Sequence, residues 1–306
     1  MTVIVALLAL LISRPALAHE GHVHWLTLRT TWTLDPWISL PLGSLAILYV
    51  AGVHRIWRRA GWGRGVRLWQ VGSFVLAWML LVLALMSPVH WLGDRLFVAH
   101  MIEHEILMTL AAPLLVIARP GNCILWALPI VLRRRLGALG RIPALTTLWR
   151  RWLTNPLIAT ILHGGALWIW HAPVLYEAAL QDTGIHWLQH LSFFVTALLF
   201  WSALLYGRVP ERSYGAAVFY LFATSLHSGF LGILITLAHQ PLYPLQTSAA
   251  PEWSLSPLED QQLAGLVMWV PAGLVYALAA LTLSALWIKR SGAHAAQAGP
   301  YAIPAR

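Results

Sequence analysis

The stretch His100-Met101-Ile102-Glu103-His104-Glu105-Ile106-Leu107 places two imidazoles and two carboxylates inside a segment that is otherwise apolar enough to cross a membrane. Ionisable side chains are costly at that depth, so they read as functional where they occur. In a helix, His100 and His104 stack one turn apart with Glu103 beside them, which puts three candidate ligands or proton carriers on one face. The alternative is a pair of histidines hydrogen-bonded between helices. Matching groups at the same depth on other helices would favour a metal site.

The composition is that of an integral membrane protein, because 59% of the 306 residues are hydrophobic and only 10% are charged. The net charge of +9 comes from short basic clusters between apolar runs. This pattern is typical of cytoplasmic membrane loops and argues against a nucleic-acid partner. The single cysteine, Cys123, excludes an internal disulfide and a multi-thiolate metal site. A bound metal would therefore rest on histidine, methionine and carboxylate ligands.

We predict an all-α integral membrane protein with seven transmembrane helices, since seven apolar runs are long enough to cross a bilayer. These runs are 37–56, 66–86, 96–118, 156–172, 186–206, 215–237 and 261–287. Between the third and fourth runs, the proline-broken segment 122–132 and the Trp/Arg-rich segment 141–152 are expected to lie along the membrane interface.

Residues 1–18 predict a cleaved signal peptide, because an apolar run ends in the small-x-small pattern Ala16-Leu17-Ala18. An uncleaved anchor is the alternative, since the usual basic residues before the run are missing. Cleavage would leave a His-rich extracytoplasmic tail over 19–36, a membrane domain over 37–290 and a cytoplasmic tail over 291–306. In the extracytoplasmic tail, His19, His22 and His24 are further candidates for collecting metal ions.

The basic residues fix the expected orientation. All lysines and arginines except Arg14, Arg29 and Arg95 fall in the loops after the first, third, fifth and seventh runs. The positive-inside rule then places the N-terminus outside and the C-terminus inside, in a bacterial inner membrane. With this orientation, every histidine except His54 and His294 lies in the outer half or on the outer surface, and every acid except Glu211 does so too. A region rich in imidazole and carboxylate concentrates cations and suits metal capture.

Eight of these side chains are candidate metal ligands. His186 and His190 repeat the i, i+4 spacing of His100 and His104, so two helices each present a two-imidazole face. We predict that these four histidines and His171 converge in one outer-half pocket. Asp260 is expected at the entrance of that pocket, while His163 and His227 lie near the midplane and are candidates for a second layer. The candidate ligands are thus His100, His104, His163, His171, His186, His190, His227 and Asp260.

These residues resemble the CtaG-type cytochrome c oxidase assembly factors of bacteria. The similarity covers the third to seventh runs and is carried by His100-Met101-Ile102-Glu103-His104, Ala112-Pro113-Leu114-Leu115, Trp168-Ile169-Trp170-His171-Ala172-Pro173, His186-Trp187-Leu188-Gln189-His190, Pro241-Leu242-Tyr243 and Asp260-Gln261-Gln262-Leu263-Ala264-Gly265. The resemblance implies a seven-helix inner-membrane protein that is not an enzyme and is required to build an active haem-copper oxidase. The implied partners are the catalytic subunit of that oxidase, to which copper would be supplied, and an extracytoplasmic copper donor.

The expected cargo is Cu(I), which imidazole and thioether ligands would favour. Two other classes of function stay open at this point. Paired helical histidines also occur in membrane enzymes that use haem or a di-iron centre. A copper transporter would need ligands that continue to the inner side, where His54 alone gives little support.

Overall fold

The computed structural model describes residues 31–206 and 214–297, and every regular element in these two ranges is a helix. The predicted signal peptide and most of the His-rich tail lie outside the described residues. In chain order the elements are α2 (Pro36–Ala60), α3 (Leu68–Met86), α4 (Pro88–Gly93), α5 (Phe97–Glu105), η2 (Ile106–Ala111), α6 (Ala112–Ala118), α7 (Pro120–Ala127), α8 (Ile130–Leu139), α9 (Pro143–Thr147), η3 (Leu148–Leu153), α10 (Pro156–Trp170), α11 (Pro173–Gln181), α12 (Thr183–Tyr206), α13 (Tyr214–Thr236), η5 (Ala250–Trp253) and α14 (Pro257–Gln297).

Six of the predicted runs form segments that are long and apolar enough to cross a membrane by themselves. The fourth run differs, because α10 has 15 residues and at 1.5 Å per residue reaches only about 22 Å, less than the roughly 30 Å of a bilayer core. It meets the criterion only together with α11, from which it is bent by 74°. The chain is thus a multi-pass membrane protein, with six candidate spans in the described ranges 31–206 and 214–297, or seven if the bent pair is one span.

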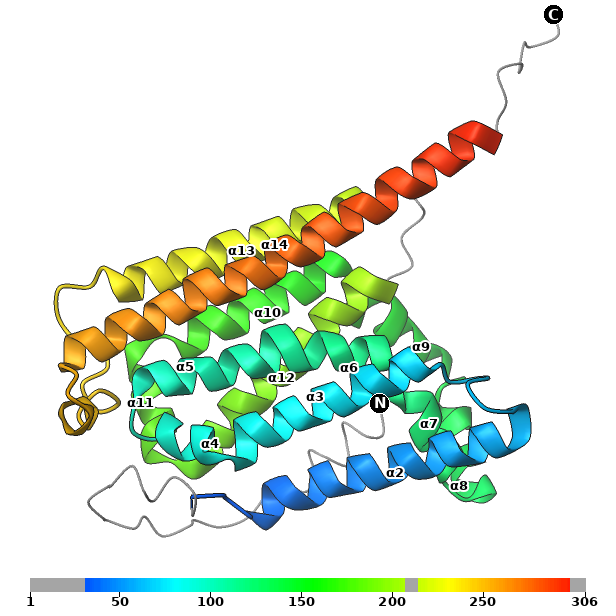
Figure 1. Ribbon diagram of the computed structural model, residues 1–306, viewed down its shortest axis with the longest axis horizontal. Coiled ribbons are helices and arrows are strands. Elements are labelled where there is room, and N and C mark those ends of the chain that lie inside the picture. Colours follow the sequence, from blue (N-terminus) through cyan, green and yellow to red (C-terminus); the bar gives the residue numbers. More distant parts are fainter. Residues whose placement is uncertain (1–30, 207–213, 298–306) are drawn as a thin grey trace, which may run out of the picture.

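The long helices run roughly side by side, and the short ones gather at the two ends of the bundle (Figure 1). α13 and α14 lie against each other, while α5 and α6 run beside α3, and α2 lies at the edge of the bundle. α4, α11 and the loop before α14 lie at one end, and α7, α8 and α9 lie at the other. We refer to these as the α4 end and the α7 end.

The first of the two segments expected along the interface, 122–132, is divided between α7 and the start of α8. α7 buries Cys123 and Ile124 against α2, where Gly52 leaves room for the backbone of Cys123. α8, in contrast, buries none of its residues. Only the second part therefore has the exposure expected of an interfacial helix, while α7 belongs to the packed bundle.

The third span is not a uniform α-helix. α5 carries His100, Glu103 and His104 and passes directly into the π-helix η2. Trp201 of α12 donates its indole N–H to the carbonyl of Met108 in η2, at 3.0 Å. A π-helical turn holds one more residue than an α-helical turn and commonly occurs at functional sites. Here it separates the register of α5 from that of α6.

Two glycines let α13 and α14 approach closely. A Cβ at Gly232 would lie 2.7 Å from the carbonyl oxygen of Gly265, and a Cβ at Gly265 would lie 2.6 Å from that of Gly232. Side chains of any size are excluded at such a contact, which is the small-residue packing common between membrane helices. The contact fixes the start of α14 relative to the rest of the bundle.

We predict that Gly265→Ala destabilises the protein by about 1–3 kcal/mol, because its methyl group must push the two backbones apart. The measurement is thermal unfolding in detergent, followed by tryptophan fluorescence. Gly273→Ala on the same helix is the matched control, since its Cβ would meet only the Ser225 hydroxyl at 3.8 Å. Equal melting temperatures for the two variants would contradict the packing argument.

Candidate metal centre

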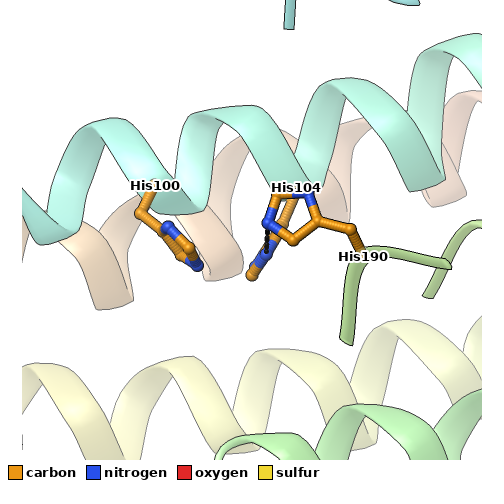
Figure 2. Close-up of side chains that lie close together, drawn as sticks. All are labelled: His100, His104 and His190. Atoms are coloured by element: carbon orange, nitrogen blue, oxygen red, sulfur yellow. Dashed lines mark hydrogen bonds between the residues drawn. The ribbon is translucent and has the colours of Figure 1, made fainter. Parts of the chain in front are cut away.

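Five histidines from three helices meet near the α4 end, and we name them the histidine cluster: His100, His104, His171, His186 and His190. Its centre is formed by His100, His104 and His190, which are all buried and whose ligand nitrogens lie within 4.8 Å of one another. Figure 2 shows these three rings between α5 and α12. The Nε2 atoms of His104 and His190 are 3.3 Å apart, so they share either a proton or an ion.

The other two members complete the cluster. The ring of His186 lies 5.4 Å from that of His100 and 4.5 Å from that of His190, centroid to centroid. His171, at the end of α10, is near enough to interact electrostatically with His100 and His104. The predicted convergence of the two His-x3-His faces is therefore confirmed as geometry. His104 belongs to this cluster, and His163 and His227 are the candidate histidines that lie outside it.

The cluster contains buried ring nitrogens that have no hydrogen-bond partner among the described residues. They are both nitrogens of His100, Nδ1 of His104, Nε2 of His171 and Nε2 of His186. Nδ1 of His171 lies 2.7 Å from the carbonyl oxygen of Leu167. Because a carbonyl only accepts, Nδ1 carries the proton and Nε2 of the neutral ring keeps a bare lone pair. Unpaired buried polar atoms are costly in a protein interior, and an ion bound among them would satisfy them.

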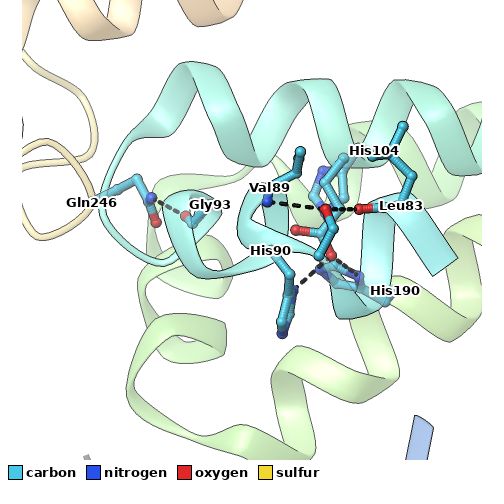
Figure 3. Close-up of polar contacts among 9 residues, drawn as sticks. Leu83, Val89, His90, Gly93, His104, His190 and Gln246 are labelled. Atoms are coloured by element: carbon cyan, nitrogen blue, oxygen red, sulfur yellow. Dashed lines mark hydrogen bonds and ion pairs between the residues drawn. The ribbon is translucent and has the colours of Figure 1, made fainter. Parts of the chain in front are cut away.

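Glu103 orients the centre of the cluster. Its fully buried carboxylate accepts a hydrogen bond from Nδ1 of His90 at 3.0 Å and lies 3.4 Å from Nδ1 of His190 (Figure 3). A carboxylate at Nδ1 favours the tautomer that leaves Nε2 free as a ligand. Burial alone lowers the pKa of His90, but the carboxylates of Glu103, Asp94 and Asp35 raise it overall to about 9. His90 is thus an imidazolium at neutral pH and balances the charge of Glu103.

The end of α4 is fitted closely to α5. A Cβ at Gly93 would lie 3.0 Å from Oε2 of Glu103, so glycine leaves the space that the carboxylate needs. The carbonyl of Gly93 accepts a hydrogen bond from Gln246 at 2.8 Å, which ties α4 to the loop before α14 (Figure 3). Two elements, α4 and the loop before α14, therefore hold His90 and Glu103 in place.

Asp260 does not line an entrance to the cluster, as the sequence had led us to expect. It is fully buried, and its two carboxylate oxygens accept the backbone N–H groups of Phe97 and Val98 at 2.8 and 3.0 Å. These are first-turn donors of α5 that have no partner within the helix, and a negative charge there also suits the helix dipole. Asp260 thus positions the helix that carries His100 and His104, and its oxygens are already occupied.

Aromatic side chains pack around part of the cluster. Tyr176 lies over His100, with ring centroids 5.5 Å apart, and Phe193 lies 4.8 Å from His104. Both are almost completely buried. Tyr243 donates its hydroxyl to the backbone carbonyl of His171 at 2.7 Å and so fixes the end of α10. These contacts bury His100, His104 and His171 among aromatic side chains.

One side of the cluster faces a large apolar cavity of about 1010 Å³ between α2, α7 and α12. His190 lines this cavity, together with Trp187, Leu191 and Phe194 of α12 and apolar residues of α2 such as Leu45. Among the described residues, His190 thus joins the histidine cluster to a space that another apolar segment could enter.

His163 and His227 lie apart from the cluster. His163 packs against Phe200 and contacts Thr196 of α12, while His227 of α13 lies over Gly164 of α10. His163 and His227 therefore lie apart from His104, which belongs to the histidine cluster.

Two functional residues are missing from the set predicted from sequence. His90 had been grouped only with the histidines of the outer half or outer surface, and nothing in its spacing relates it to the other candidate ligands. Glu103 had been recognised as a candidate ligand or proton carrier beside His100 and His104, but not as the group that orients His190. The adjacency of Glu103 to His104 was a signal for this role, whereas the role of His90 depends on the fold of α4 back onto α5.

Comparison with known protein families agrees with the resemblance seen in the sequence. The family model described as cytochrome c oxidase caa3 assembly factor (Caa3_CtaG) matches residues 47–290, which include the whole histidine cluster. The comparisons with curated proteins and with solved structures found no match. The matched range covers most of the 306 residues, and the chain belongs to the Caa3_CtaG family of cytochrome c oxidase assembly factors.

Proposed function

We propose that this assembly factor binds Cu(I) in the histidine cluster and delivers it to the catalytic subunit of a haem-copper oxidase. The observation that carries the proposal is the convergence of His100, His104 and His190, with ligand nitrogens within 4.8 Å of one another and several of them without a partner. An oxidase assembly factor has a clear use for a copper site, because the enzyme needs the metal in order to function.

The chemistry of the ligands supports a transition metal. Imidazole nitrogen suits copper, zinc, iron and nickel, whereas magnesium and calcium prefer sets of oxygen ligands. The buried Cys123 belongs to α7 at the opposite end of the bundle and offers no thiolate here. A role in the assembly of a copper-containing oxidase favours copper among these candidates, and burial in an apolar bundle favours the lower charge of Cu(I).

Delivery would proceed by ligand exchange. Imidazoles without thiolate hold Cu(I) less tightly than cysteine sites do, which suits a donor that must release its ion. His190 is the member of the cluster that borders the apolar cavity between α2 and α12. A membrane segment of the oxidase that enters this cavity would reach the ion through His190. The acids and histidines on the outer surface, including His19, His22 and His24, would collect copper from an extracytoplasmic donor.

We further propose that the α4 end faces the extracytoplasmic side of the bacterial inner membrane, with the N-terminus outside and the C-terminus inside. The distribution of arginines supports this orientation, because Arg133, Arg134 and Arg135 lie in α8 at the α7 end. Copper would then arrive on the side where the histidine cluster lies.

The orientation is tested with single cysteines in a Cys123→Ala background. Gln181→Cys after α10 and Ala138→Cys in α8 are both at exposed positions. We expect a membrane-impermeant maleimide to label the first variant in intact spheroplasts, and the second only after permeabilisation. The reverse pattern would invert the topology.

Purified protein in detergent should bind Cu(I) when titrated anaerobically against a chromophoric chelator. His104→Ala and His190→Ala should each weaken binding at the cluster at least 100-fold, because each removes a central ligand. Glu103→Gln should weaken it about 10- to 100-fold by releasing His190 from its orientation. His54→Ala at an exposed position on α2 is the control. A haem absorption band or stoichiometric iron in the purified protein would instead favour the enzyme alternative.

In cells, His171→Ala or His190→Ala should abolish oxidase activity in copper-poor medium while the factor remains inserted and the oxidase apoprotein is made. Excess copper should restore part of the activity, because the missing step is supply of the metal. Deletion of residues 19–24 should give a milder defect, confined to low copper. Fully copper-loaded oxidase in the two histidine variants would rule out the donor mechanism and leave a structural chaperone.

A further inference from the structure

A second pair of histidines lies between α10, α12 and α13, away from the histidine cluster. His163 is fully buried, and its Nδ1 lies 3.2 Å from the hydroxyl oxygen of Thr196. That hydroxyl has one hydrogen, which it donates to the backbone carbonyl of Ser192 at 2.7 Å. Thr196 can therefore only accept from His163, so Nδ1 of the neutral ring carries the proton and Nε2 keeps a bare lone pair. This Nε2 is buried and has no hydrogen-bond partner within the described part of the chain.

His227 meets the same region from α13. A Cβ at Gly164, the residue after His163, would lie 3.1 Å from both Cε1 and Nε2 of the His227 ring. The missing side chain of Gly164 thus makes the space in which this ring lies, directly beside the turn of α10 that carries His163. In the ranges that the structure describes, both ring nitrogens of His227 are buried without a partner, as is the hydroxyl of Thr224 one turn earlier on α13. Two histidines and one threonine thus leave four buried polar atoms unsatisfied in the bundle.

We infer that His163 and His227 form a second metal site, which binds one Cu(I) ion through their ring nitrogens. The polar groups on the two sides, His163 with the hydroxyl of Thr196 and the imidazole of His227, provide no negative charge. A divalent ion would therefore bring two uncompensated charges into an apolar bundle, whereas a monovalent ion brings one. Imidazole is a ligand for copper, and a bound ion would satisfy nitrogens that nothing else satisfies.

The second site is distinct from the histidine cluster. Thr196 follows His190 by six residues on α12, which is about 9 Å along the helix axis. Phe193 lies between them in the chain, is fully buried and contacts His104. The pair at His163 and His227 would thus be a store or relay deeper in the bundle, and the inference does not require copper to bind at the cluster.

The test is the Cu(I) stoichiometry of the full-length protein in detergent, measured anaerobically by competition with a chromophoric chelator. We expect two ions per chain in the wild type and one in His163→Ala or His227→Ala. The double variant His104→Ala/His190→Ala should retain one ion, held by the second site. If that double variant binds no copper, the second site does not exist. If the wild type binds a single ion that is lost only in the His163 and His227 variants, the second site stands and copper binding at the cluster fails.

Two milder variants separate ligation from folding. Thr196→Val keeps the shape of the side chain but removes the acceptor that orients His163, and it should weaken the second site about 10- to 100-fold. Gly164→Ala should displace the His227 ring and weaken the same site. Gly165→Ala is its matched control, because a Cβ there would meet nothing within 4 Å. Equal Cu(I) affinity at the second site in Gly164→Ala, Gly165→Ala and Thr196→Val would overturn the inference.

Discussion

The carboxylate of Glu103 lies completely buried in an apolar bundle, in contact with His90 on one side and His190 on the other. A lone charge at that depth would be very costly, and the imidazolium of His90 offsets it. The same carboxylate turns His190 so that its Nε2 meets that of His104. The charge balance of the pocket and the direction of its ligands thus depend on a single side chain, whose carboxylate packs tightly against the glycine at position 93.

The long elements are set by composition and could be read from the chain. Apolar runs of about 20 residues must form helices in a membrane, because their backbone groups find no other partners there. The i, i+4 spacing then puts His100 over His104 and His186 over His190, whatever the rest of the fold does. The observed helices and the observed cluster follow these expectations closely. The fourth run is the exception, since a helix too short to cross alone is hard to recognise from apolar content.

What the sequence did not predict depends on contacts between segments far apart in the chain. Asp260 is an acid near the start of an apolar helix, and its position suggested a pocket entrance. Only the packing of α14 against α5 shows that it caps a helix that begins 163 residues earlier in the chain. His90 becomes part of the site because α4 folds back onto α5. Neither contact produces a periodic pattern in the sequence of a single segment, so neither could be predicted from one.

The π-helix η2 has a consequence for how this span tolerates change in length. Residues before it face the histidine cluster, and residues after it pack against α3 and α12. Loss of one residue between Ile106 and Ala111 would convert the wide turn to an ordinary α-helical turn, in which each residue advances about 100°. If α6 then kept its packing against α3 and α12, α5 would be rotated and its histidines would turn away from the cluster. If α5 kept its orientation, α6 would lose its packing. The two halves of the span therefore behave as separate modules, joined by a spacer of fixed length whose size matters more than its side chains.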